Sequence, residues 1–249
     1  MPAGNNTCVI LQPSYIPWRG YFHQIHEADV FIFYDDVPYD KHGWRNRNRI
    51  KAPGGCQWLT IPVISKGNVT HGLRIDEVSI DPNQRWAEKH WRTIQQIYGR
   101  APFFARYAPF IEPFYRQPPS LLVDFTIPLT ITIARDLLGI GHTRFERSSR
   151  LGISGTKTSR LVALASFFGA TRYVSGPAAR EYIDERQFQD AVIAVEYMNY
   201  DYVGYPQRFP PFEPAVSVLD LVFTVGPDAG RYIWERPAAG AAQVQGVEG

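Results

Sequence analysis

Residues 9–34 read VILQPSYIPWRGYFHQIHEADVFIFY, and this stretch decides the fold. An apolar run at residues 9–11 is followed by apolar residues at helical spacing from Tyr21 onward, and then by a second apolar run at residues 28–34. A strand, a helix and a strand in this order are typical of a parallel unit. Because the second run is continuous rather than alternating, it indicates a parallel sheet that is covered on both faces.

The same pattern returns in the second half of the chain. We predict strands at residues 145–149, 173–175 and 191–197, and a helix at residues 158–169. Strands and helices that alternate on either side of an insertion predict an α/β fold with one doubly wound, mostly parallel, Rossmann-like sheet. We assign residues 1–235 to this single α/β domain.

The insertion covers about residues 40–140 and begins with an antiparallel hairpin. Its strands at residues 44–51 and 57–64 are separated by a Pro-Gly-Gly turn. An alternating segment at residues 73–80 predicts a further strand of this extension.

The rest of the insertion is predicted to be helical. Apolar residues at helical spacing predict a helix over residues 86–98. Pro109 and Pro113 predict short helical turns instead of one helix in residues 101–117, and Pro128 predicts a kink or an end in the next helix.

Composition limits the classes of protein that fit. The 249 residues are 45% hydrophobic and 20% charged with a formal net charge of +2, which argues against a general nucleic-acid binder. There is no uninterrupted apolar run of membrane-spanning length and no signal-peptide pattern at residues 1–7, so we expect a cytoplasmic protein without membrane insertion. We predict a helix at residues 218–225 and a flexible tail at residues 236–249.

Polar and aromatic residues gather where the first two strands end. Residues 12–18 follow the first strand and residues 35–39 follow the second. Ligands of open parallel sheets bind beyond the carboxyl ends of the strands, so we expect a site at this edge. Neither a GxGxxG fingerprint nor a Walker loop is present.

Residues 44–51, WRNRNRIK, alternate strictly between guanidinium or ammonium groups and other side chains. One interpretation is an edge strand protected from aggregation by its charges. The other is an anion clamp, because guanidinium groups match the geometry of phosphates and carboxylates. The loop GISGTKTSR at residues 152–160 runs into a helix start and offers a second anion site.

Histidines offer weaker signals. His90 lies among aromatic residues on a predicted helix, so it is either a packing residue or a general base. His23 and His26 share one side of a helix, but no third ligand is near them in the sequence, so we predict no metal site.

Six segments carry a resemblance to a known family. They are QPSYIPWRGYF, ADVFIFYDDVPYDK, WRNRNRIK, WLTIPV, RLVALASFFGATRYVSGPAAREYI and SVLDLVFTVG. In this order and spacing they resemble the WbqC-like protein family over nearly the whole chain before the tail. The sequence departs from the family pattern at Pro38, where Gln is usual, so a side-chain amide next to the expected site is missing.

The resemblance implies a bacterial cytoplasmic protein of O-antigen, other surface-polysaccharide or natural-product biosynthesis. It implies transfer of an acyl or aminoacyl group, such as glycyl, to an amino group of an amino sugar or amino acid. The catalytic residues that we predict from the matched motifs are Asp36, His90 and Lys41. The predicted substrate-binding residues are Gln12, Tyr15, Trp18, Tyr39, Trp44, Asn46, Arg47, Asn48, Lys51 and Ser175.

In this hypothesis the predicted residues have separate roles. Lys41, Arg47 and Lys51 hold the phosphate or carboxylate of an anionic donor. Asp36 or His90 accepts a proton from the attacking amine. An amide of Gln12, Asn46 or Asn48 donates to the developing oxyanion.

Two alternatives stay open at this point. The chain begins with a strand, a loop, a helix and a strand, and a later loop reads SGTKTSR. This arrangement is distantly similar to that of nucleotidylyltransferases, although their HxGH signature is absent. The second alternative is a non-catalytic protein that binds a sugar phosphate or a carrier protein. The sequence identifies no cofactor, and the expected partners are an anionic donor and an amine acceptor, with a carrier protein as a further candidate.

Overall fold

The computed structural model describes residues 6–64, 72–235 and 243–244 and is built around a five-stranded parallel sheet. The strands of this sheet are β1 (Thr7–Leu11), β2 (Val30–Phe33), β5 (Arg144–Arg147), β6 (Arg172–Ser175) and β7 (Ala194–Tyr197). Their order in space is β5-β2-β1-β6-β7, and every neighbouring pair is parallel. The predicted α/β fold with a mostly parallel sheet is confirmed.

Seven α-helices accompany the sheet in the described part of the chain. They are α1 (Arg19–Glu27), α2 (Trp86–Tyr98), α3 (Phe104–Arg116), α4 (Leu122–Thr132), α5 (Lys157–Phe167), α6 (Glu185–Asp190) and α7 (Val218–Val225). None of the helices in the described residues is long and apolar enough to cross a membrane.

The sheet is covered on both faces because successive strand residues point to opposite sides. Val9 and Phe31 belong to a buried cluster with residues of α1, α4 and α7. Ile10 and Ile32, one position further along each strand, belong to a second cluster with residues of α5 and α6. This arrangement explains why residues 28–34 are continuously apolar.

The direction in which the chain adds strands changes once. From β1 it proceeds to β2 and β5 on one side, and then crosses to β6 and β7 on the other. The carboxyl ends of β1 and β6 therefore border the crevice in which doubly wound proteins bind ligands.

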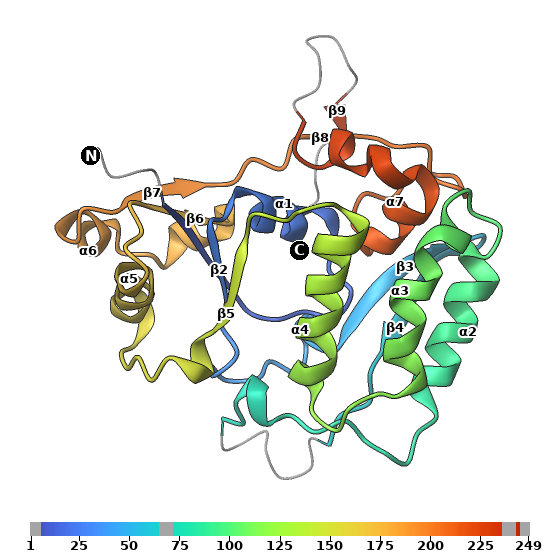
Figure 1. Cartoon of the computed structure of the whole chain (residues 1–249), viewed down its shortest axis with the longest axis horizontal. Coiled ribbons are helices and arrows are strands. Elements are labelled where there is room, and N and C mark those ends of the chain that lie inside the picture. The colour runs from blue at the N-terminus through green and yellow to red at the C-terminus, as the bar shows by residue number, and fades with distance from the viewer. Residues whose placement is uncertain (1–5, 65–71, 236–242, 245–249) are drawn as a thin grey trace.

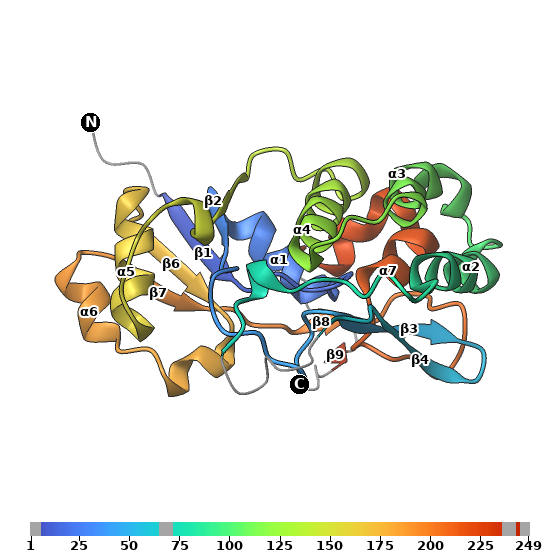
Figure 2. The same ribbon diagram turned by 90° about the horizontal axis from the view of Figure 1, so that it is seen from below.

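The predicted hairpin is also confirmed. It consists of β3 (Arg47–Ala52) and β4 (Gly55–Thr60), paired antiparallel with Arg47 opposite Thr60. In both views the hairpin lies with α2 and α3 at one end of the long axis, and α5 and α6 lie at the other (Figures 1 and 2).

The prediction that prolines break the helices of the insertion is wrong. The α3 helix continues through Pro109 and Pro113, and α4 continues through Pro128 into a π-helical turn at Ile133–Leu137. All three prolines are exposed, so the carbonyl groups that lose their hydrogen bonds face solvent. Burial of the opposite side of each helix outweighs the proline penalty of about 3 kcal/mol.

The predicted strand at residues 73–80 is a second correction. These residues form a 3₁₀ turn at Ile75–Glu77 and single bridges to other segments. Ile75 and Val78 are both buried and lie three positions apart, so one turn directs both side chains into the core. The three-residue spacing of Ile75 and Val78, at the centre of residues 73–80, is therefore that of a helical turn and not of a strand.

The ends of two strands differ from the prediction. β5 stops at Arg147 because Ser148 and Ser149 turn toward the carboxylate of Asp35 and donate hydrogen bonds to it. β7 begins at Ala194 because the turn that ends α6 extends to Ile193.

The predicted flexible tail at residues 236–249 lies outside the described residues, apart from Gln243–Val244. These two residues form β9, which pairs antiparallel with β8 (Tyr202–Val203).

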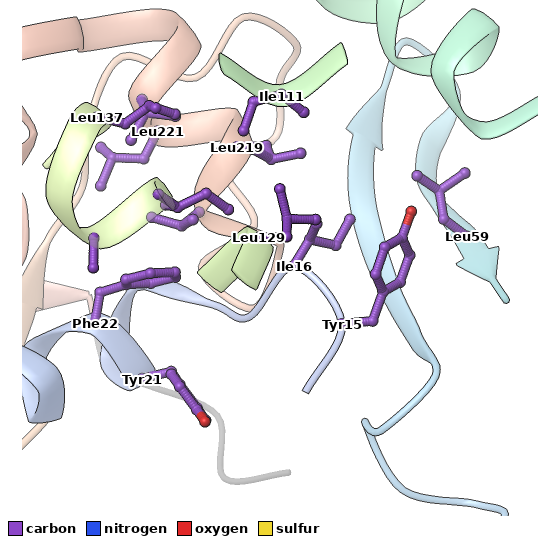
Figure 3. Close-up of a cluster of buried hydrophobic side chains, with 14 of the residues drawn as sticks. Tyr15, Ile16, Tyr21, Phe22, Leu59, Ile111, Leu129, Leu137, Leu219 and Leu221 are labelled. Atoms are coloured by element: carbon purple, nitrogen blue, oxygen red, sulfur yellow. The ribbon is translucent and has the colours of Figure 1, made fainter. Parts of the chain in front are cut away.

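The larger buried cluster joins the sheet to the insertion. Figure 3 shows its members from the loop after β1 (Tyr15, Ile16), from α1 (Tyr21, Phe22) and from β4 (Leu59). Ile111 of α3, Leu129 of α4 and Leu219 of α7 belong to the same cluster. Full burial of one such side chain contributes about 1.5–3 kcal/mol. The insertion thus shares one core with the sheet and holds the hairpin beside the end of β1.

Candidate functional site

A cavity of about 680 Å³ lies in the crevice at the carboxyl ends of β1 and β6. Leu11 and Gln12 line it from the end of β1, and Ser175 and Gly176 line it from the end of β6. This position is the one that the strand order dictates for a ligand.

The cavity wall is aromatic at many points and carries few charges. Its aromatic side chains are Trp18, Tyr21, Tyr34, Trp44, Tyr173, Tyr182 and Tyr200. Its polar side chains are Gln12, Ser14, Gln24, Arg45, Asn48, Arg49 and Ser175. In the described part of the chain, no Asp, Glu, His or Lys lines this wall.

The two ends of the cavity differ in chemistry. Trp44, Arg45 and Arg49 come from the hairpin side, so this end is aromatic and cationic. Leu161 of α5 with Pro177 and Ala178 after β6 forms the other end, which is uncharged. The cavity therefore fits an elongated ligand with an anionic group at one end.

Arg45 is the most informative residue of the cationic end. Its Nη1 donates a 3.2 Å hydrogen bond to the carbonyl oxygen of Pro13, whereas its buried Nε has no partner among the described residues. Burial lowers the pKa of Arg45 although the charge of Asp40 opposes this shift, and within the described residues no carboxylate forms a salt bridge with Arg45. A desolvated cation without a direct ion pair favours an anionic ligand.

Arg49 has a similar environment. Its Nη2 donates a 2.9 Å hydrogen bond to the carbonyl oxygen of Ala215, and its buried Nε has no partner in residues 6–64, 72–235 and 243–244. Glu213 is 4.0 Å from Nη2, and both side chains are partly exposed, so this pair is weak. Arg49 therefore has hydrogen-bonding capacity left for a ligand.

Asn48 and Asn46 hold the backbone around the cavity. The Nδ2 of Asn48 donates to the carbonyl oxygens of Tyr15 and Ile16 at 3.2 Å and 3.0 Å, and its Oδ1 accepts from the amide of Arg49. These bonds fix the loop after β1, in which Ile16 has a φ of 37°. Asn46 lies in the core, where its Nδ2 donates a 2.8 Å hydrogen bond to the carbonyl oxygen of Ile61.

Trp18 forms part of the cavity wall and depends on Gly20. The indole packs edge-on against Tyr200 with ring centroids 5.0 Å apart. A Cβ on Gly20 would lie 2.3 Å from the nearest ring atom of Trp18, closer than any real contact. The sequence WRG thus places a residue without a side chain where the indole must lie.

We expect Gly20→Ala to displace Trp18 and to weaken ligand binding about tenfold, since a stacked ring contributes about 1–1.5 kcal/mol. The helix itself should tolerate alanine, because alanine favours helices by about 1 kcal/mol over glycine. Tryptophan fluorescence and a thermal melt would test this together. Unchanged fluorescence and affinity in a folded variant would show that the ring does not need this space.

Asp36 lies outside the cavity wall. Its carboxylate is paired with Arg160 and accepts a hydrogen bond from the hydroxyl of Ser148. Desolvation alone would raise its pKa, but the hydrogen bonds from Arg160 and Ser148 outweigh this and lower it. The Arg160 guanidinium in turn lies 5.1 Å from the ring centroid of Tyr34, which lines the cavity.

His90 and Tyr15 are joined in the core. The Tyr15 hydroxyl is 2.9 Å from Nδ1 of His90 and 2.7 Å from the hydroxyl of Tyr115, and Tyr15 is 0% exposed. Desolvation lowers the pKa of His90 to about 4, so this imidazole is neutral at pH 7. The structure places both predicted site residues in a buried network that does not line the cavity.

This shift predicts acid sensitivity of the fold. Between the unfolded pKa of 6.5 and the folded pKa of about 4, only the unfolded state binds the proton, so stability falls as pH falls. We expect His90 to account for a loss of about 2 kcal/mol between pH 7 and pH 5.

Urea unfolding at the two pH values measures this loss. The variant His90→Gln should lose about 2 kcal/mol less than the wild type over this range, whereas His142→Gln, an exposed control, should behave like the wild type. An equal pH dependence in wild type and His90→Gln would contradict a buried neutral imidazole.

The remaining predicted residues are dispersed. Lys41 is exposed, and Arg47 stacks on Trp58 with its guanidinium 4.9 Å from the ring centroid. Tyr39 is partly buried, and Lys51 is buried at 3% exposure. The predicted residues that line the cavity together are Gln12, Trp18, Trp44, Asn48 and Ser175.

The model of the WbqC-like protein family matches residues 12–232, and this range contains every polar residue of the cavity wall. The chain belongs to the WbqC-like protein family. This member is 43% identical over 225 residues to a protein of Mycobacterium tuberculosis that is itself uncharacterized. The alignment covers 90% of this chain and 96% of the mycobacterial protein. No solved structure matches the chain.

Reasoning from the sequence did not single out much of the cavity wall of this WbqC-like protein, including Arg45, Arg49, Gln24 and Tyr200. Arg45 and Arg49 were recognised as part of the basic ribbon, but strict alternation placed them on the same face as Arg47. Strand β3 begins only at Arg47, so Trp44 and Arg45 precede it and both reach the cavity. Nothing in the sequence distinguishes Gln24 and Tyr200 from ordinary surface residues.

Proposed function

We propose that this protein is a group transferase that joins an acyl or aminoacyl group to an amino group, and that its anionic donor binds in the crevice cavity. One observation carries the proposal: Arg45 and Arg49 line the cavity with buried Nε groups that have no partner in the described part of the chain. Guanidinium groups in such a setting match the phosphate or carboxylate of an activated donor.

The rest of the wall suits such a donor. Trp18 and Trp44 offer flat surfaces for a base or a sugar ring near the cationic end. The uncharged end at Leu161, Pro177 and Ala178 suits the group that is transferred. A volume of about 680 Å³ is within the range of pockets that enclose most of a small organic ligand.

The reaction needs few protein groups. The amine nitrogen attacks the donor carbonyl carbon, the carbon–nitrogen bond forms, and the leaving group departs with its bonding electrons. Gln12 and Ser175 lie at the ends of β1 and β6 and would donate hydrogen bonds to the oxyanion. The amine proton would pass to an anionic leaving group such as a phosphate. Asp36, which reaches the wall only through Arg160 and Tyr34, would serve as an indirect electrostatic support.

Membership of the family supports the biological setting. We propose an amino sugar or amino acid as acceptor, in bacterial surface-polysaccharide or natural-product biosynthesis. A carrier protein that delivers the donor would approach the exposed side of the hairpin, where Trp58 is 47% exposed beside Arg47.

A second candidate is a non-catalytic binding protein for a sugar phosphate. It is favoured by the composition of the wall, which among the described residues has neither a carboxylate nor an imidazole to move a proton. The same guanidinium pair would then serve only to retain the ligand.

Mass spectrometry of reaction mixtures tests the proposal. Purified protein would be incubated with acyl-coenzyme A, with ATP plus an amino acid, or with a nucleotide sugar, each together with amino-sugar and amino-acid acceptors. Formation of an amide that requires protein and is lost in Arg45→Met supports transfer. Recovery of the ligands unchanged despite tight binding would favour the binding protein, and release of pyrophosphate with nucleotide added to the acceptor would favour a nucleotidylyltransferase.

A further inference from the structure

Gln24 is a buried polar residue of the cavity wall with an unused hydrogen-bonding group. It lies on α1, is 4% exposed, and lines the cavity. Its Nε2 donates a 2.7 Å hydrogen bond to the hydroxyl of Tyr200, whereas its buried Oε1 has no partner among the described residues. An unpaired buried acceptor is costly to desolvate, so the cavity is better suited to a ligand that donates a hydrogen bond to it.

Tyr200 places this amide near the end of β6. Its hydroxyl would lie 3.5 Å from a Cβ on Gly176, at the end of β6. Burial raises the pKa of Tyr200, so the phenol keeps its proton at neutral pH and does not add a negative charge. The free Oε1 of Gln24 is therefore a neutral acceptor beside the strand ends where the reaction is proposed to occur.

Gln24 is also linked to the anion-binding end. Tyr21 precedes Gln24 by three positions on α1, and residues at this spacing are neighbours on a helix surface. Tyr21 lines the cavity, and its hydroxyl donates a 3.1 Å hydrogen bond to the carbonyl oxygen of Gln12. Arg45 and Gln24 thus line the same cavity.

We propose that Gln24, held by Tyr200, is the specificity-determining residue for the acceptor substrate, and that its Oε1 accepts a hydrogen bond from an N–H or O–H group next to the nucleophilic position of the acceptor. That this ligand is the acceptor substrate rests on the proposed function, whereas its recognition by Gln24 does not require turnover. The edge-on pair of Trp18 and Tyr200 beside the amide would contact the ring or carbon chain that bears this donor.

Calorimetry with three sugar phosphates tests the recognition. Glucosamine 6-phosphate, glucose 6-phosphate and 2-deoxyglucose 6-phosphate share an anion but carry an ammonium group, a hydroxyl group or hydrogen at C2. We expect the wild type to bind glucosamine 6-phosphate or glucose 6-phosphate about tenfold more tightly than the deoxy sugar. The sugar that binds more tightly shows whether Gln24 accepts a hydrogen bond from an ammonium group or from a hydroxyl group. Equal affinity for all three, or no binding of any, would overturn the inference.

Two substitutions make the test specific to Gln24. Gln24→Met should abolish the tenfold discrimination. Gln24→Glu should keep an acceptor oxygen and strengthen binding of the ammonium sugar relative to the deoxy sugar. If Gln24→Glu instead weakens the ammonium and hydroxyl sugars as much as Gln24→Met does, the free group is the amide nitrogen and the inference fails. Gln95→Met, an exposed change on α2, controls for the loss of a glutamine.

Turnover separates this inference from the proposed function. Discrimination that depends on Gln24 without any amide product would retain the inference and contradict group transfer. Amide formation whose acceptor KM is unchanged in folded Gln24→Met and Gln24→Glu would retain the transferase and overturn the inference.

Discussion

Arg45→Met should weaken binding of an anionic ligand about 100-fold or more, while Arg47→Met should change it less than threefold. Loss of one partner from a desolvated, hydrogen-bonded charge pair costs about 2–5 kcal/mol, which corresponds to such a factor. The Nε groups of Arg45 and Arg47 are both buried without a partner among the described residues, but Arg45 lines the cavity, whereas Arg47 stacks on Trp58 outside it. Methionine keeps much of the aliphatic volume, so the change removes mainly the guanidinium group.

Titration calorimetry of both variants at two salt concentrations measures this difference. Arg45→Lys is an informative companion, because it keeps the charge but loses the planar fork, and it should bind with intermediate affinity. A thermal melt of each variant controls for loss of the hydrogen bond from Arg45 to the Pro13 carbonyl. If Arg47→Met proved as damaging as Arg45→Met, the outer face of the hairpin would hold the anion instead.

Tyr15→Phe should lower the free energy of unfolding by about 3 kcal/mol and leave turnover per folded molecule unchanged. The hydroxyl of Tyr15 contacts both His90 and Tyr115 in the core, and its removal leaves two buried polar groups unpaired. Each unpaired group costs about 1–3 kcal/mol. The effect is therefore expected on stability and not on chemistry.

Urea unfolding and steady-state kinetics separate the two roles. Tyr182→Phe is a matched control for stability alone, because its ring is 69% exposed but lines the cavity, and removal of its hydroxyl should change stability by less than about 0.5 kcal/mol. A Tyr15→Phe protein that keeps wild-type stability but loses kcat would instead support the sequence-based prediction that Tyr15 contacts the substrate.

The sheet and its crevice were predictable because apolar runs carry direct information. Residues 9–11 and 28–34 are apolar because β1 and β2 are covered on both faces, and the strand ends then fix where a ligand binds. Pro109 and Pro113 misled the prediction because a proline penalty is local, whereas the burial that outweighs it comes from the rest of the fold.

The composition of the site was harder to predict. The basic ribbon was correctly assigned to a hairpin, but which guanidinium reaches the cavity depends on where β3 begins, and strand ends are poorly determined by sequence. Gln24 and Tyr200 are 176 positions apart and meet only in the fold. For His90, the sequence predicted its position on a helix but not its burial against Tyr15.

The central claim is that Arg45 and Arg49 form an anion site in the crevice between β1 and β6. Proton–nitrogen NMR of the arginine Nε groups tests it most directly, with resonances assigned from Arg45→Lys, Arg49→Lys and Arg47→Lys and with inorganic pyrophosphate as the probe. The account predicts saturable shifts of the Arg45 and Arg49 resonances and none for Arg47. Shifts confined to Arg47, or no saturable shift at Arg45 or Arg49, would contradict it.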